Sequence, residues 1–241
     1  MIRGVLFDKD DTLLDLATFW RLPVQHTMVF MLHELGRDDD APLRQALEAA
    51  CGFEGAALIP ESPVVAGTNA DVIAACMEVL AAQGITTFND SLFARLSEAM
   101  LEWTCLQDGV CTPTGDLRAV FDALHAAGCK TGVATSDSYA STYHALEAMG
   151  ITNAVDLVLT ADRVARPKPA PDMAEIFAAR FGLAPEDLAM VGDSANDMRF
   201  ARNSGMTAIY FDRDGRAASG AIDADAIVRR LEEVPALVAR L

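Results

Sequence analysis

At 241 residues, the chain is long enough for one large domain or for a core with a smaller insert. It carries 19 Lys and Arg against 35 Asp and Glu, and this net charge of −16 disfavours nucleic acid as a partner because it repels phosphate backbones. The N-terminus becomes charged too soon for a signal peptide, and no apolar stretch could span a bilayer. The five cysteines are scattered without a C-x-x-C pair, so we expect reduced thiols, no membrane association and a cytoplasmic protein.

The chain begins with an apolar run at residues 2–7 that ends abruptly in charge, a pattern typical of a buried strand. Four segments follow in which apolar residues recur at helical spacing: residues 17–35, 42–51, 69–82 and 91–106. Residues 52–68 contain three glycines and two prolines. They are predicted to form a long loop that faces the substrate, because loops of this length in a compact domain are often functional.

Beyond residue 113 the pattern alternates between strands and helices. Strands are predicted at residues 130–134, 156–159, 188–191 and 207–211, and helices at residues 116–127, 138–149, 172–181 and 197–203. This alternation predicts an α/β fold in which a parallel sheet has helices on both faces. The predicted domains are a core of residues 1–15 and 112–241 and an inserted all-helical domain of residues 16–111.

Polar residues gather where the predicted strands of the core end. In open α/β sheets, ligands bind at the carboxyl ends of the strands, so these residues are expected on one edge of the sheet. They are Asp8, Asp10, Asp11 and Thr12 after the first strand, then Thr135, Ser136 and Asp137, then Lys168 in a proline-rich loop, and finally Asp193 and Asp197.

This set of residues suits phosphoryl transfer. Asp8 and Asp10 are two apart at the end of an extended segment, so their side chains can converge on one site. An ionised Asp8 could attack phosphorus and form an aspartyl-phosphate, while Asp10 protonates the leaving oxygen and later deprotonates the attacking water. Mg²⁺, which prefers oxygen ligands, would offset the repulsion between the carboxylates, with Asp193 as a further ligand.

The phosphoryl group itself needs cationic and hydrogen-bonding partners. Lys168 would neutralise both the nucleophile and the phosphoryl oxygens, and the hydroxyl of Thr135 with nearby backbone N–H groups would hold the non-bridging oxygens. The residues predicted to bind phosphate are Asp11, Thr12, Thr135, Ser136 and Lys168. Thr135 could also cap the helix that follows it, and Asp197 could cap its own helix or orient Lys168.

Four motifs carry a resemblance to a known superfamily: FDKDDTLLD at residues 7–15, GVATSDS around Thr135, RPKPAPD around Lys168, and VGDSANDM around Asp193. Together they resemble the haloacid dehalogenase superfamily and specifically its phosphoglycolate-phosphatase-like branch. The resemblance implies a Rossmann-like core with a helical cap inserted after the first motif. It also implies that the Asp8 side chain, the Asp10 main-chain carbonyl and Asp193 bind Mg²⁺, with Asp197 nearby or as a further ligand.

One residue departs from the family pattern. The position after the second aspartate is most often glycine in this branch, and here it is Asp11. Because aspartate tolerates left-handed backbone better than most residues, the tight turn is expected to survive. We therefore expect Asp11 to act mainly as a backbone substitute.

The expected activity is hydrolysis of a small phosphate monoester, of the phosphoglycolate or sugar-phosphate type. A β-phosphoglucomutase-type phosphotransferase and a catalytically silent phosphate-binding regulatory protein are the alternatives. Dehalogenation is disfavoured because it has no leaving alkoxide for Asp10 to protonate. Candidate substrate-facing residues in the cap are Trp20, Glu61 and Ser62, although packing is the usual role of such a tryptophan. No pattern in the sequence indicates an oligomeric state.

Overall fold

The computed structural model describes residues 1–55, 57–59, 62–85, 90–105, 111–215 and 222–241. The chain divides into two compact units. One comprises Met1–Asp15 with Cys111–Leu241, and the other comprises Leu16–Val110. Among the described residues, no helix is both long and apolar enough to cross a membrane.

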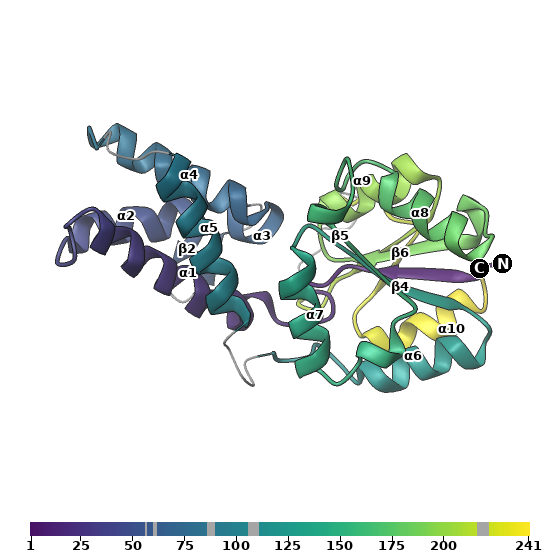
Figure 1. The fold of residues 1–241 in the computed structure, drawn as a ribbon. Helices are drawn as coiled ribbons and strands as arrows, with labels where there is room; N and C mark the ends of the chain where they lie inside the picture. The colour runs from purple at the N-terminus through teal and green to yellow at the C-terminus, as the bar shows by residue number, and fades with distance from the viewer. Residues whose placement is uncertain (56, 60–61, 86–89, 106–110, 216–221) are drawn as a thin grey trace. The chain divides into compact units, whose positions relative to one another are not determined.

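The first unit is built on a six-stranded sheet with the order β5-β4-β1-β6-β7-β8 (Figure 1). Each neighbouring pair of strands is parallel, so all the carboxyl ends lie on one edge. This arrangement confirms the predicted parallel α/β core. The strands are β1 (Gly4–Phe7), β4 (Lys130–Thr135), β5 (Leu157–Thr160), β6 (Leu188–Gly192), β7 (Thr207–Phe211) and β8 (Ala226–Val228).

Helices cover both faces of this sheet. Figure 1 shows α8 and α9 on one side of the strands and α6 and α10 on the other. Side chains from α7 pack on the same face as α6. The core helices are α6 (Leu117–Ala126), α7 (Tyr139–Ala148), α8 (Asp172–Phe181), α9 (Ala195–Ser204) and α10 (Val234–Val238).

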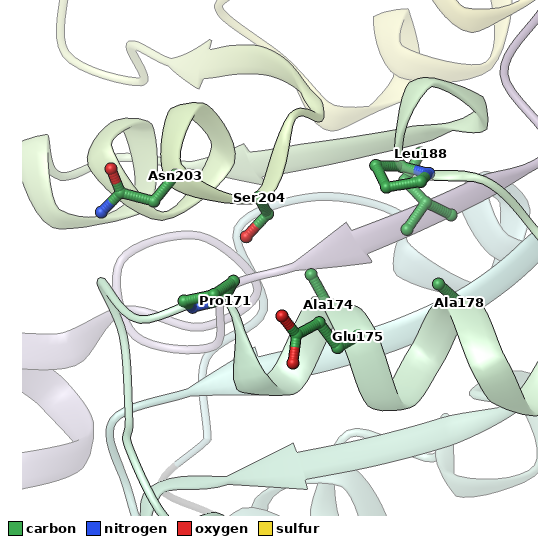
Figure 2. Close-up of a pocket in the computed structure, with 8 residues that line it drawn as sticks. Pro171, Ala174, Glu175, Ala178, Leu188, Asn203 and Ser204 are labelled. Carbon is green, nitrogen blue, oxygen red and sulfur yellow. The ribbon is translucent and has the colours of Figure 1, made fainter.

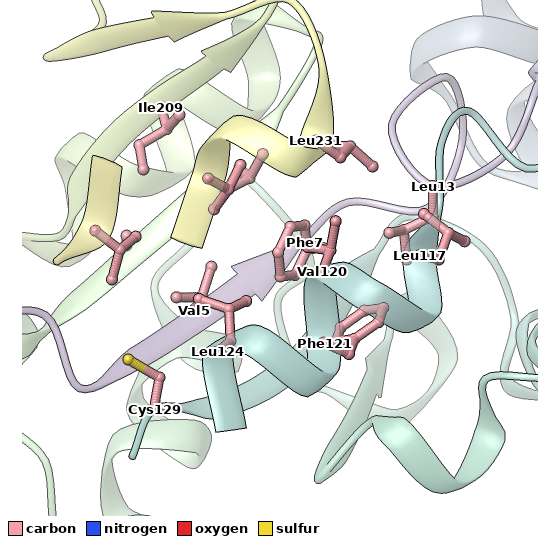
Figure 3. Packing of buried hydrophobic residues seen from close by; sticks show 14 of the residues in the cluster. Val5, Phe7, Leu13, Leu117, Val120, Phe121, Leu124, Cys129, Ile209 and Leu231 are labelled. Carbon is pink, nitrogen blue, oxygen red and sulfur yellow. The ribbon is translucent and has the colours of Figure 1, made fainter. Parts of the chain in front are cut away.

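The two central strands, β1 and β6, are apolar and buried at every position. Along β1, Val5 and Phe7 belong to the cluster under α6, whereas Leu6 belongs to the cluster under α8 and α9. Phe7 meets Phe121 of α6 edge-on, with ring centroids 5.2 Å apart (Figure 3). This alternation follows from the two-residue period of a strand and fixes the register of β1, so the residues just after Phe7 are positioned by the core.

The second unit is mainly helical, and each of its larger helices packs against another. α1 packs on α5 and α2 packs on α4. A bidentate ion pair joins Arg95 of α5 to Glu34 of α1, with N–O distances of 2.7 and 2.8 Å. The helices are α1 (Leu16–Glu34), α2 (Ala41–Cys51), α3 (Pro63–Ala66), α4 (Asn69–Ala82) and α5 (Asp90–Cys105).

The prediction of an irregular loop over residues 52–68 was wrong. The segment contains a two-stranded antiparallel sheet of β2 (Phe53–Glu54) and β3 (Ala57–Leu58), followed by the short helix α3. The turn between the strands uses Gly55 with a φ of 60°. Strands of two residues are too short to show alternation in the sequence, so the glycines and prolines dominated the pattern.

All five cysteines are free in the structure. Cys51 and Cys76 lie far apart in the sequence, but their Sγ atoms are 3.4 Å apart inside the helical unit. Cys129 is buried in the first unit, where its thiol contacts the carbonyl oxygen of Ile2.

Candidate active site

Lys168 links two carboxylates at the carboxyl edge of the sheet. Its Nζ lies 2.7 Å from Oδ1 of Asp8 and 2.6 Å from Oδ1 of Asp197. All three side chains are buried. Burial alone lowers the pKa of Lys168, but Asp197 and Asp8 outweigh it and raise the pKa above its ordinary value. Lys168 therefore remains an ammonium ion beside Asp8.

The first turn of α9 fixes the position of Asp197. Ser194 is the N-cap residue, and its hydroxyl and backbone N–H both donate to Oδ2 of Asp197. The Asp197 N–H in turn donates to the Ser194 hydroxyl, which completes a capping box. Asp197 thus caps its helix with one oxygen and binds Lys168 with the other, so the two roles suggested by the sequence coexist.

Gly192 makes room for this arrangement at the end of β6. A Cβ at Gly192 would lie 2.4 Å from Cγ of Asp197, which is closer than real Cβ contacts. Only glycine at this position lets Asp197 pack against the end of the strand and face Lys168.

Three carboxylates converge at the ends of β1 and β6. Oxygens of Asp8, Asp193 and Asp197 all lie within 4.8 Å of one another. Burial raises the pKa of Asp8 to about 7; Lys168 opposes this, and Asp197 and Asp10 add to it. Burial also raises the pKa of Asp193 well above its ordinary value, with further contributions from Asp197, Asp8 and Asp11.

These carboxylates fit a divalent cation. The donors are all oxygens, which is the set that Mg²⁺ prefers. Burial is the main cause of the raised pKa values of Asp8 and Asp193, neighbouring carboxylates add to it, and a bound cation would stabilise the ionised form of both groups. Because both oxygens of Asp197 already accept hydrogen bonds, Asp8 and Asp193 are the better candidates for side-chain ligands. Thr12 donates its hydroxyl to Oδ1 of Asp193 at 3.0 Å and orients that carboxylate.

Thr135 is the last residue of β4, which pairs with β1, and its side chain is buried. Its hydroxyl accepts the N–H of Asp137 at 3.1 Å, so it does not cap the next helix. That role belongs to Ser138, whose hydroxyl accepts the N–H of Ser141. Ser136 is half-buried directly after the strand. The Thr135 side chain and the N-terminal region of α7 thus occupy the edge where phosphate binding was predicted.

Asp11 occupies the left-handed backbone region, with a φ of 54°. This agrees with the expectation that aspartate replaces glycine in the turn. Its carboxylate lies 3.3 Å from the guanidinium of Arg213, which also approaches Asp15 at 3.2 Å. Sequence patterns did not reveal Arg213, because nothing near it in the chain indicates that it meets residues about two hundred positions earlier.

Lys9 is a second buried lysine near the site, and the sequence patterns did not predict a role for it. Nζ of Lys9 lies 2.8 Å from Oδ1 of Asp10 and 3.0 Å from Oδ2 of Asp137. Alternation along the chain gave the signal: if Asp8 and Asp10 share one direction, the residue between them points the other way, toward the packed interior. A charged residue there requires a buried partner.

The candidate substrate-facing residues lie in the helical unit. Trp20 is buried in α1, with its ring 5.4 Å from that of Phe19. Ser62 is buried and packs against Gly52 so closely that a Cβ on that glycine would lie 2.0 Å from its hydroxyl oxygen. Both placements are typical of packing residues. Glu61 lies outside the described residues.

A separate pocket lies between α8 and α9 (Figure 2). Its lining is mostly apolar and has a single carboxylate, that of Glu175. It contains none of the predicted site residues, and a phosphoryl group with a cation requires more charged partners than it offers. We therefore assign the chemistry to the aspartates. The lining residues are Pro171, Ala174, Glu175, Ala178, Pro185, Leu188, Asn203 and Ser204.

The fold is a parallel α/β core, and Lys168 joins carboxylates at the carboxyl edge of its sheet. These features are typical of α/β proteins that bind charged ligands at that edge. Comparison with protein families is more specific. The haloacid dehalogenase-like hydrolase family matches residues 2–205, and the chain belongs to this family.

Individual relatives match shorter parts of the chain. A probable phosphatase, IndB, of Dickeya dadantii (strain 3937) is 44% identical over 86 residues, which are 36% of this chain and 37% of IndB. A phosphoglycolate phosphatase of Escherichia coli (strain K12) is 34% identical over 87 residues, 36% of this chain and 34% of that protein. The chain thus spans little more than a third of the length of these curated relatives.

The fold itself is shared over nearly the whole chain. A crystal structure of a predicted phosphoglycolate phosphatase from Haemophilus somnus 129pt superposes with a TM-score of 0.71. The match covers 98% of this chain and 97% of the other at 16% sequence identity. At this identity the likeness shows the fold alone.

Proposed function

We propose that this protein is a Mg²⁺-dependent phosphatase that hydrolyses a small phosphate monoester through an aspartyl-phosphate on Asp8. The observation that carries the proposal is the contact of Lys168 with Asp8 at 2.7 Å, in a site where Asp193 supplies a second buried carboxylate. The names of the relatives support the same reaction class, since one is a probable phosphatase and another a phosphoglycolate phosphatase.

In the first half of the reaction, a carboxylate oxygen of Asp8 attacks phosphorus and the bond from phosphorus to the ester oxygen breaks. Asp10 gives its proton to the departing oxygen, which leaves as an alcohol. Lys168 reduces the repulsion between the Asp8 carboxylate and the phosphoryl oxygens, because its ammonium is already in contact with Asp8. Thr135 and backbone N–H groups near it hold the remaining phosphoryl oxygens.

In the second half, water attacks phosphorus and Asp10 takes its proton. The bond between phosphorus and Asp8 breaks, which releases inorganic phosphate and restores the free carboxylate. Asp8, the Asp10 main-chain carbonyl and Asp193 would hold Mg²⁺, with Asp197 nearby. The cation would supply positive charge that neutralises the phosphoryl oxygens.

The helical unit is proposed to act as the cap that selects the substrate. It enters the chain directly after Asp15, eight positions after Phe7 ends β1. A small phosphorylated acid or a sugar phosphate is the proposed substrate class, in keeping with the phosphoglycolate phosphatase among the relatives.

A panel of phosphate monoesters assayed with Mg²⁺ tests the proposal. We expect release of inorganic phosphate from at least one small ester by the wild type and none by Asp8→Asn. Conversion of a sugar 1-phosphate to its isomer without net phosphate release would instead identify a mutase. If neither reaction occurs with any ester, the phosphatase proposal fails and the result favours the alternative of a phosphate-binding protein without catalytic activity.

A further inference from the structure

Lys9 lies between the proposed acid–base residue and a second buried carboxylate. Its side chain is fully buried, and its Nζ contacts Asp10 at 2.8 Å and Asp137 at 3.0 Å. The Asp137 side chain is also buried, with 2% of its surface exposed. Lys9 therefore joins two carboxylates, those of Asp10 and Asp137, into one series of charged contacts.

Packing alone does not explain a charge at this position. Moving an ammonium ion out of water is strongly unfavourable until its partners offset the loss of hydration, and apolar residues of similar size often replace buried ion pairs without loss of stability. The neighbouring Phe7 and Leu13 show that the surroundings accept apolar side chains, since both are fully buried in the adjacent core. The charge of Lys9 therefore has a role beyond filling space.

The contacts on each side of Lys9 fix its position. The N–H groups of Leu13 and Leu14 donate to the Lys9 carbonyl at 2.8 and 3.1 Å, which folds the chain back over this residue. On the far side, Oδ1 of Asp137 accepts the N–H of Ser138 at 2.6 Å. Lys9 is thus held by a turn at one end and by an anchored carboxylate at the other.

Asp137 also connects this series to the predicted phosphate-binding edge. Its N–H donates to the hydroxyl of Thr135 at 3.1 Å. A continuous path of contacts therefore runs from Asp10 through Lys9 and Asp137 to Thr135. Through these contacts, the position of Asp10, the proposed proton donor, is fixed relative to Thr135, the proposed phosphoryl-binding residue.

We propose that Lys9 is a positioning residue for Asp10, with Asp137 as its anchor. Lys9 holds Oδ1 of Asp10, which fixes the carboxylate rotamer and directs the second oxygen, Oδ2, to the leaving group. This inference rests on the proposed phosphatase function, in which Asp10 protonates the departing oxygen. It assigns a role to the residue between the two aspartates of the first motif.

A series of substituted phenyl phosphates tests the inference, because these esters are similar in size and differ in the leaving group's need for a proton. The constant kcat/KM reports the steps up to departure of that group. We expect Lys9→Met to lower kcat/KM about a hundredfold for unsubstituted phenyl phosphate but only about threefold for p-nitrophenyl phosphate, whose leaving group departs without an acid. A plot of log kcat/KM against leaving-group pKa should therefore become steeper.

Two further variants keep the test interpretable. Lys9→Met leaves Asp137 buried without its cation, so the double variant Lys9→Met/Asp137→Asn removes both charges and retains the shape. It should show the same steep plot. Lys130→Met serves as the matched control, because Lys130 pairs with Asp156 on the exposed surface. It should leave the plot unchanged.

A purely structural role for Lys9 predicts different results. An equal fall in kcat/KM for every ester, or loss of folding in both Lys9 variants, would overturn the inference while the phosphatase proposal stands. If the wild type hydrolyses none of the esters in this series or in the wider panel, the phosphatase proposal fails and the inference fails with it.

Discussion

Oδ1 of Asp197 lies 2.6 Å from Nζ of Lys168, and the same ammonium lies 2.7 Å from Asp8. Asp197 is held by the capping box of α9, so the cation beside the proposed nucleophile is fixed by a helix start. The loop that carries Lys168 is fastened to the same helix, because Asn203 donates to the carbonyl of Pro169 at 2.9 Å. Helix α9 thus holds the Lys168 side chain through Asp197 and the neighbouring backbone at Pro169 through Asn203.

Lys168→Gln should lower kcat by at least about a hundredfold, because it removes the cation that offsets repulsion between Asp8 and the phosphoryl group. Steady-state hydrolysis of the best ester from the panel measures this. Lys130→Gln is the matched control, since it breaks an exposed ion pair with Asp156 and should leave kcat unchanged. Equal effects of the two substitutions would contradict the role of Lys168.

Gly192→Ala should lower activity without contacting the substrate. The new Cβ would lie 2.4 Å from Cγ of Asp197, so Asp197 must move and Lys168 loses its support. Gly115→Ala is a suitable control, because its nearest neighbour is the carboxylate end of the Glu232 side chain, which can move away. Wild-type kcat in a folded Gly192→Ala variant would show that the position of Asp197 does not matter.

Two substitutions at Asp11 separate its backbone role from its charge. Asp11→Gly should retain most of the activity, because glycine adopts the φ of 54° without strain. Asp11→Ala removes the same charge but places a side chain with a Cβ in the left-handed backbone region. Its free energy of unfolding should therefore be about 1 kcal/mol lower than that of Asp11→Gly. Urea denaturation measures the difference. A large loss of turnover in folded Asp11→Gly would show instead that the carboxylate takes part in catalysis.

Mg²⁺ binding should depend on pH. Without a cation, the folded chain keeps a proton on Asp8 up to about pH 7, against an ordinary pKa of 3.8. Between these values the folded state binds more protons than the unfolded state, so the free energy of unfolding falls as the pH rises through this window. Mg²⁺ replaces the protons, and its stabilising effect should therefore be greater at about pH 8 than at about pH 5.

Thermal denaturation with and without Mg²⁺ at the two pH values measures this effect. Asp8→Asn should lose most of the Mg²⁺-induced rise in Tm. The matched control is Asp122→Asn, which removes an exposed aspartate paired with Arg118 and should keep the full rise. A rise in Tm that is the same at both pH values would contradict the predicted competition between cation and protons.

Sequence patterns predicted the parallel core because its strands have both faces buried and therefore read as apolar runs, as residues 4–7 do. The ends of these strands then placed Asp8, Thr135 and Asp193 on one edge. The short elements were not predicted, and β8, which has three residues, is an example. The residue before it, Asp225, accepts hydrogen bonds from Arg202 and from the N–H of Ala208, so contacts with distant residues hold this strand in place. Such segments depend on tertiary contacts more than on their own sequence.

The partners of charged residues were the least predictable part of the site. Lys9 meets Asp137 and Arg213 meets Asp11 only after folding brings distant segments together. A single sequence gives the type of each residue but does not show with which charged residues it will form ion pairs. The identity of the motif residues was therefore accessible, whereas the ion pairs that orient them required the structure.

The central claim is that Asp8 carries the phosphoryl group, and a rapid acid quench during turnover tests it most directly. Wild-type protein mixed with Mg²⁺ and the best ester of the panel is quenched, digested and analysed by mass spectrometry. We predict that the peptide containing Asp8 gains the mass of one phosphoryl group and that Asp8→Asn gains none and releases no phosphate. Phosphate release at the full rate with an unmodified Asp8 peptide throughout the first turnover would contradict the account.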